Sequence, residues 1–255
     1  GAAKSIRDSH PGKAVSGVLS RRQGRSENAY RTEYLCQWVT ADVDSPFPTG
    51  AWEAGTDPDS QRDPKAEVFY AVDTSSDRRF SAISIVSKRG DGLWHGEVVA
   101  YRPGIDWVLR WFRERPAKRF KVAYQGRGAP VSSIAELLDN LGNVEAFPCE
   151  GRNVAGAFGR LWDSVAACSD DSTSDAVPIM HRPQPALDQA AQVAQLRKLG
   201  DGARGLDRDG TPGVDISPLV ALSFALWLAT TGTVGKKPTI FPSAYAQDDH
   251  GPIFI

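Results

Sequence analysis

The chain has 255 residues, and its 30 lysines and arginines against 31 aspartates and glutamates give a formal net charge of −1. A charge so close to zero excludes a general electrostatic attraction to nucleic acid, so any such binding must come from local patches. The three cysteines, Cys36, Cys149 and Cys168, form no C-x-x-C pair, which argues against a disulfide scaffold or a structural zinc site and favours a reducing compartment.

The length suits one domain of roughly 150 to 200 residues with an extension. The longest apolar stretch, residues 218–229, is shorter than the about 20 residues that a membrane-spanning helix needs. The N-terminal residues lack the apolar region of a signal peptide. We therefore expect a soluble intracellular protein that does not contact a membrane.

Residues 1–66 are rich in Arg, Ser, Pro, Gly and Asp, which predicts a largely irregular extension. One helix is expected there, over 28–39, because Tyr30, Tyr34 and Trp38 recur at helical spacing. The pattern then changes to apolar runs separated by polar turns, which predicts an antiparallel meander. The three strands of this meander are expected at 67–73, 80–87 and 93–101.

Helices and strands alternate after the meander. Helices are expected at 104–114, 131–141, 152–168 and 184–199, with strands at 119–124, 144–147 and 178–181. A nearly all-apolar, buried helix begins at Ser217-Pro218, an N-cap serine followed by proline. This order predicts an α/β fold with a mixed sheet and helices on both faces, formed by residues 67–230 and followed by a tail over 231–255.

Asp73 is the most informative acid, because it ends the first strand, Glu67-Val-Phe-Tyr-Ala-Val-Asp73. A buried strand needs no acid at its last position. Desolvation of a carboxylate is costly unless the group is paired or bound to a metal. The position therefore suggests a metal ligand.

A second acid, Asp215, precedes the buried helix in Gly213-Val-Asp-Ile-Ser-Pro218. Its simplest interpretation is a helix-start residue at the positive end of the helix dipole. Taken together, an Asp on the first strand and an Asp at the last helix resemble the pair by which ribonuclease-H-like nucleases hold divalent cations. Hard cations such as Mg²⁺ prefer oxygen ligands. Two such ions, about 3.5 to 4 Å apart, can activate water and stabilise the leaving oxygen of a phosphodiester.

Several segments, taken in order, resemble one protein family. They are Ala71-Val-Asp-Thr-Ser-Ser-Asp77, Asp106-Trp-Val, Val122-Ala-Tyr-Gln-Gly-Arg-Gly-Ala-Pro-Val-Ser-Ser133, Met180-His-Arg-Pro-Gln-Pro-Ala-Leu-Asp-Gln-Ala190, Leu199-Gly-Asp-Gly202 and Asp215-Ile-Ser-Pro-Leu-Val-Ala221. The family is the C-terminal nuclease domain of the large terminase subunit of tailed phages, which has a ribonuclease-H-like fold. Residues 20–52 are similar to the segment that joins the packaging ATPase to this nuclease.

The resemblance implies a metal-dependent endonuclease that cuts concatemeric phage DNA during packaging. It assigns Mg²⁺ or Mn²⁺, as two ions, to Asp73 and Asp215. It also implies double-stranded DNA, the packaging ATPase domain, the small terminase subunit and the portal as partners. The expected location is then the cytoplasm of the infected host.

Gln125 departs from the family pattern, which commonly has a second acid at the end of the fourth strand. Its neutral carbonyl oxygen would make a weaker metal site, unless Asp77, Asp209 or Asp163 substitutes as a ligand. Asp77 and Asp209 also fit simple turn positions, and Asp163 fits the surface of a helix. His181 is isolated, and a structural role is the simpler interpretation.

Three arginines, Arg78, Arg79 and Arg127, lie in predicted turns at the strand ends that border the acids. We expect them to contact DNA phosphates. Such contacts position the DNA backbone without reading its bases. Residues 1–5 and 232–237 echo a phosphate loop but lack its full motif, so no ATP hydrolysis is expected. Two other functions remain open: a catalytically weak DNA-docking or motor-regulating module of the same fold, and a resolvase-type nuclease.

Overall fold

The computed structural model describes residues 45–115, 119–169, 173–211 and 213–231. The predicted helix over 28–39 and residues 232–255 of the predicted tail lie outside these ranges. The boundaries of the extension, the domain and the tail stay predictions.

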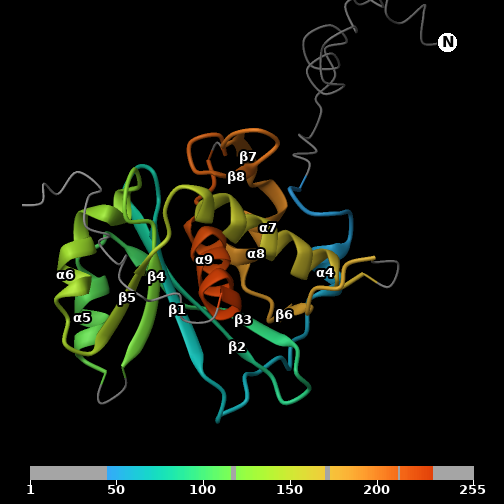
Figure 1. Cartoon of the computed structure of the whole chain (residues 1–255), viewed down its shortest axis with the longest axis horizontal. Helices are drawn as coiled ribbons and strands as arrows, with labels where there is room; N and C mark the ends of the chain where they lie inside the picture. Colours follow the sequence, from blue (N-terminus) through green and yellow to red (C-terminus); the bar gives the residue numbers. More distant parts are fainter. Residues whose placement is uncertain (1–44, 116–118, 170–172, 212, 232–255) are drawn as a thin grey trace, which may run out of the picture. The chain divides into compact units, whose positions relative to one another are not determined.

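A six-stranded mixed sheet forms the centre of the described region (Figure 1), in the order β5-β4-β1-β2-β3-β6. The first three strands form the predicted antiparallel meander, β4 and β5 continue it in parallel beyond β1, and β6 lies parallel to β3. The strands are β1 (Val68–Thr74), β2 (Phe80–Lys88), β3 (Trp94–Pro103), β4 (Phe120–Tyr124), β5 (Val144–Pro148) and β6 (Ile179–His181). The mixed sheet confirms the predicted fold class.

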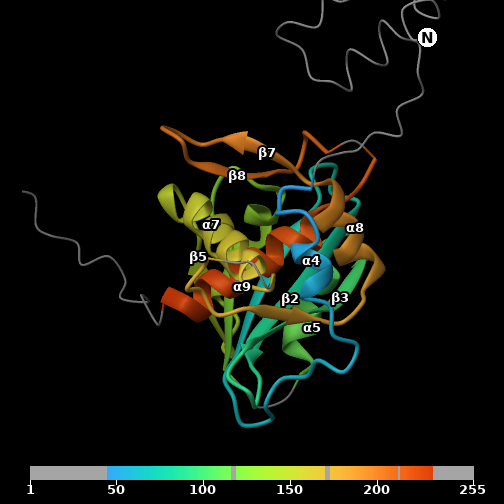
Figure 2. The same ribbon diagram turned by 90° about the vertical axis from the view of Figure 1, so that its right-hand side faces the viewer.

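Helices cover both faces of this sheet (Figures 1 and 2). One face carries α5 (Trp107–Arg113), the 3-10 helix η1 (Pro130–Ile134) and α6 (Ala135–Asp139). The other carries α4 (Ala51–Ala54), α7 (Arg152–Ala166), α8 (Pro185–Val193) and α9 (Ser217–Thr231). Among the described residues, no helix combines the length and the apolar character that a membrane crossing requires.

Helix α9 is the centre of the second face, and it is buried, as its nearly all-apolar sequence predicts. Its leucines at 219, 222 and 226 are fully buried between the sheet and the helices α7 and α8. Burial of one such side chain contributes about 1.5–3 kcal/mol. Ser84 on β2 donates its hydroxyl to the Pro218 carbonyl at 3.0 Å, which fixes the start of α9 against the strand.

The prediction of a helix over 184–199 is wrong in its last third. Helix α8 ends at Val193, and the chain then forms the hairpin of β7 (Gln195–Lys198) and β8 (Arg204–Asp207). Leu196 and Leu206 face each other across this hairpin and pack against the core. This burial, together with a turn closed by the Leu199 N–H and the Ala203 carbonyl at 2.9 Å, outweighs local helix propensity.

Two smaller differences concern local helix geometry. The predicted helix over 131–141 begins at Pro130 as the 3-10 turn η1 before it continues as α6. The short helix α4 lies within the N-terminal segment that was expected to be irregular, and it buries Trp52 against α7. Both elements are too short for periodicity to reveal them.

Candidate active-site cleft

Asp73 lies one residue before the end of β1 and is fully buried. Residues two apart on a strand point to the same side, and Ala71 packs into the core that contains α9. The Asp73 side chain therefore faces α9, from the same sheet face as the apolar core. Its burial agrees with the sequence argument that this carboxylate must be paired or bound to a metal.

The partner is Arg208, on the loop that follows β8. Its Nε and Nη2 donate to the two carboxylate oxygens of Asp73 at 2.8 and 2.7 Å. Only 10% of the Arg208 side chain is exposed, so this is a nearly dry, bidentate ion pair, the strongest arrangement these groups form. Burial raises the pKa of the Asp73 carboxyl, and the Arg208 guanidinium opposes this rise.

Gln125 follows β4 and lies beside this pair. Ala71 and Ala123 are register partners on the parallel strands β1 and β4, so Asp73 and Gln125, each two residues further, are level with one another. The Gln125 amide donates to the Arg127 carbonyl at 2.9 Å, whereas its Oε1 is buried without a hydrogen-bond partner. Gln125 and Arg208 also line one small cavity, about 10 Å³, roughly the size of a single water.

Asp215 lies just before α9, and its partners are neutral. Its oxygens accept hydrogen bonds from the Ser217 N–H at 2.8 Å, the Ser217 hydroxyl at 2.9 Å and the Tyr101 hydroxyl at 3.1 Å. Burial, followed by the nearby charge of Asp215, raises the pKa of Tyr101, which holds the phenol protonated as a donor. The helix-start role is therefore real, but Asp215 also faces open space.

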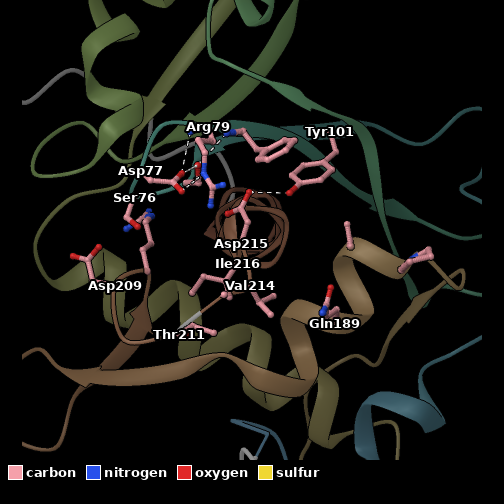
Figure 3. A pocket seen from close by; sticks show the side chains of 16 residues that line it. Ser76, Asp77, Arg79, Tyr101, Gln189, Asp209, Thr211, Val214, Asp215 and Ile216 are labelled. Carbon is pink, nitrogen blue, oxygen red and sulfur yellow. Dashed lines mark hydrogen bonds and ion pairs between the residues drawn. The ribbon is translucent and has the colours of Figure 1, made fainter.

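That space is a cleft of about 660 Å³ (Figure 3). It lies between the β1–β2 turn, the end of β3, the start of α8 and the loop from β8 to α9. Its charged and polar lining consists of Ser75, Ser76, Asp77, Arg79, Tyr101, Gln189, Arg208, Asp209, Thr211 and Asp215. Asp73 is beneath this surface and is connected to the cleft through Arg208.

The β1–β2 turn places an acid and a base at the edge of the cleft. Asp77 accepts from the Ser75 hydroxyl at 2.8 Å and from the Arg79 N–H at 3.0 Å, and it forms an ion pair with the Arg79 guanidinium. These hydrogen bonds lower the pKa of Asp77 to about 2, with the Arg79 N–H as the largest cause. The predicted turn role of Asp77 is thus present, on the wall of the cleft.

No protein-family model and no curated protein matches this sequence. Among solved structures, the large terminase of bacteriophage HK97 matches with a TM-score of 0.54 at 16% identity, covering 88% of this chain and 53% of that one. This chain has a large-terminase fold. Its sheet and helices confirm the ribonuclease-H-like class that the sequence motifs imply.

This chain spans about half the length of the HK97 large terminase. Two further matches have lower TM-scores. The large terminase nuclease from thermophilic phage G20c gives 0.47 at 11% identity, covering 69% of this chain and 96% of that one. The large terminase nuclease domain of Thermus phage P74-26 gives 0.42 at 13% identity, with coverages of 65% and 81%.

Within this terminase fold, the predicted phosphate-binding arginines lie in the two turns expected from the sequence. Arg127 is 89% exposed, with Glu150 at 3.8 Å. Arg78 has a left-handed backbone at φ 60°, rare for a residue other than glycine, and donates to the Ser133 hydroxyl at 3.0 Å. Arg79 lines the cleft itself.

Of the remaining candidate residues, one acid lies near the cleft, whereas a second acid and His181 lie away from it. Asp209 is exposed and lines the cleft next to Arg208. Asp163 lies on the exposed side of α7, in a different groove. His181 is buried, stacks on Trp52 with ring centroids 4.0 Å apart, and contacts the Trp52 carbonyl through Nε2 at 3.1 Å, consistent with a structural role.

A divalent metal is implied by this fold, but the residues as arranged do not fit one. Both Asp73 oxygens are held by Arg208, and both Asp215 oxygens accept neutral hydrogen bonds. Within the described ranges, no three His, Cys, Asp or Glu side chains are grouped in a way that could hold a metal ion. The oxygen chemistry suits Mg²⁺ or Mn²⁺, yet a guanidinium already stands at the buried carboxylate.

Sequence reasoning missed Arg208 and Tyr101. The segment Asp207-Arg-Asp-Gly210 predicts a turn, with Asp209 as a turn residue or a substitute metal ligand, and nothing in the linear sequence distinguishes Arg208 from the other arginines. The one available signal is the expected burial of Asp73, which requires either a charged partner or a bound metal. Tyr101 ends a strand in the sequence, and only the packing of β3 against the start of α9 brings its hydroxyl to Asp215.

Proposed function

We propose that this chain is the nuclease-type domain of the large subunit of a phage DNA-packaging terminase, and that its cleft binds the backbone of duplex DNA. The observation that carries this proposal is the cleft at the carboxyl end of β1, which combines Asp77, Asp209 and Asp215 with Arg79. In α/β sheets, ligands bind outside the carboxyl ends of the strands. The likeness to a large terminase supports DNA as the ligand at that position.

The arginines at the rim supply the attraction to DNA. Arg127 reaches into solvent from the β4 loop, and Arg78 and Arg79 do so from the β1–β2 turn. Contacts from such side chains neutralise phosphates and release counterions, so affinity falls steeply with salt. Because the chain has almost no net charge, this local group must carry the binding.

Fluorescence anisotropy with a labelled duplex in EDTA tests this step. Arg127→Ala and Arg78→Ala are expected to weaken binding and to reduce the salt dependence by about one phosphate contact each. Arg110→Ala is the matched control, since this exposed arginine lies on α5, on the opposite face of the sheet. Equal affinities for all four proteins would remove the cleft as the DNA site.

Hydrolysis of the bound DNA with Mg²⁺ or Mn²⁺, using Asp73 and Asp215, is the activity proposed for a form in which Arg208 has left Asp73. Nicking of supercoiled plasmid in Mn²⁺, compared between the unmodified protein and Asp73→Ala, tests the activity. Equal nicking by both proteins contradicts it.

A catalytically weak DNA-docking module is the second candidate, and a specific observation favours it. Gln125 stands level with Asp73, where the family has an acid, and its amide is engaged with the Arg127 carbonyl. Retained DNA binding without any Mn²⁺-dependent nicking supports this candidate over the endonuclease. Under either candidate, the proposed partners are the packaging ATPase domain, the small terminase subunit and the portal in the host cytoplasm.

A further inference from the structure

We propose that Arg208 is the resident cation of this site: its guanidinium competes with divalent cations for Asp73, so that a metal binds only when Arg208 leaves. The inference deepens the proposed function and rests on it. It concerns the ligand of the buried carboxylate, whereas DNA binding at the rim is a separate property.

Geometry makes the competition exclusive. Arg208 uses one nitrogen for each oxygen of Asp73, at 2.8 and 2.7 Å, so both oxygens are engaged by the guanidinium. Asp73 has no exposed surface, so no ion can approach it from solvent while the pair is closed. A guanidinium and a divalent cation beside one carboxylate would also repel each other strongly in so dry a place.

The surrounding charges stabilise Arg208 as this cation. Burial acts to lower its pKa, yet the carboxylates of Asp73, Asp209 and Asp215 together raise it above its ordinary value. Gln125, which is level with Asp73 at the end of the neighbouring strand, contributes an uncharged oxygen. The guanidinium is therefore held in its charged form beside Asp73.

The position of Arg208 allows it to be displaced. It belongs to the loop after β8 and not to the central sheet, and it lines both the cleft and the small cavity beside Gln125. Its guanidinium can turn into the cleft while β1 and β4 keep their register. The phosphates of bound DNA would be an alternative partner for it there.

Isothermal titration with Mn²⁺ alone, without DNA, tests the competition. Arg208→Ala is expected to bind Mn²⁺ at least tenfold more tightly than the unmodified protein, and Asp73→Ala/Arg208→Ala is expected to lose this gain. Arg204→Ala is the matched control, an exposed arginine on the same hairpin, and should behave like the unmodified protein. Equal Mn²⁺ affinities for the unmodified protein and Arg208→Ala overturn the proposal.

Arg208→Lys keeps the test decisive if the alanine variant does not fold. A lysine ammonium is a single point charge and cannot bind both oxygens in the forked geometry of arginine. We expect its Mn²⁺ affinity to rise above that of the unmodified protein, and the melting temperature to rise with added Mn²⁺ more than in the unmodified protein. An unchanged affinity and an unchanged shift contradict competition.

The outcomes separate this inference from the proposed function. If duplex DNA binds in EDTA but the Arg208 variants leave Mn²⁺ affinity unchanged, only the resident-cation inference fails. If the Arg208 variants gain Mn²⁺ affinity but no variant of the rim arginines alters DNA binding, the DNA-binding cleft fails and the resident cation stands.

Discussion

Two buried polar groups lie toward opposite ends of the central strands, and they differ in what surrounds them. At one end, Asp73 pairs with Arg208 beside the 660 Å³ cleft. At the other, His95 on β3 connects Ser60 and Glu97: its Nδ1 is 2.9 Å from the Ser60 hydroxyl and its Nε2 is 3.2 Å from Glu97 Oε2. Arg89 completes this second group by donating to the Ser60 hydroxyl at 3.0 Å.

The second group satisfies its own members and holds a loop to the sheet. Arg89 also pairs with Asp57 at 2.6 Å, and Arg182 donates to the Ser60 carbonyl at 2.6 Å, so the loop 57–60 is fixed from several directions. The hydrogen bond from His95 is the largest cause of the lowered pKa of Glu97. A buried polar cluster alone therefore does not mark a functional site. The difference is that the Asp73–Arg208 ion pair adjoins the 660 Å³ cleft.

Asp73→Ala is expected to have the largest effect, because it leaves the nearly buried guanidinium of Arg208 without a counter-charge. Removal of one member of a buried ion pair costs about 3–5 kcal/mol in the free energy of unfolding, measurable by urea denaturation. Asp215→Ala is the comparison, and the loss there should be about 1–2 kcal/mol, since its donors are neutral and partly solvated. A similar loss for both variants would show that the Asp73–Arg208 pair is not specially stabilising.

Ser60→Ala tests the opposite cluster and should have an intermediate effect. It removes the partner of a buried His95 nitrogen, which costs about 1–3 kcal/mol in the free energy of unfolding. Duplex DNA affinity and Mn²⁺ binding are expected to stay unchanged, because this cluster stabilises the loop only. A change in either binding property contradicts the division between the two groups.

Asp77 gives the smallest effect, through pH. Its folded-state pKa of about 2 lies below the ordinary value of 3.8, so its contribution to stability is complete above about pH 4 and is lost as the pH falls toward 2. An NMR titration of the Asp77 carboxyl should show a midpoint near 2, and Asp77→Asn should flatten the stability profile in this window. A midpoint near 3.8 would mean that the turn's hydrogen bonds are not formed in solution.

Much of the fold could be predicted from local patterns. Alternating apolar runs predicted the meander β1–β3, and the apolar run after Ser217-Pro218 predicted the buried helix α9. The hairpin β7–β8 could not be predicted in this way, because its four-residue strands are stabilised by burial of Leu196 and Leu206 against distant elements. Local helix propensity pointed to the wrong structure there.

The sequence by itself determined that Asp73 would be buried at the end of a core strand and that such a carboxylate needs a cation, since desolvation of an unpaired charge is too costly. It also determined that Asp215 precedes a buried helix. Only the tertiary structure decided which cation pairs with Asp73. Arg208 is 135 residues away in the chain, and its approach depends on a hairpin whose formation is fixed by packing, not by local sequence.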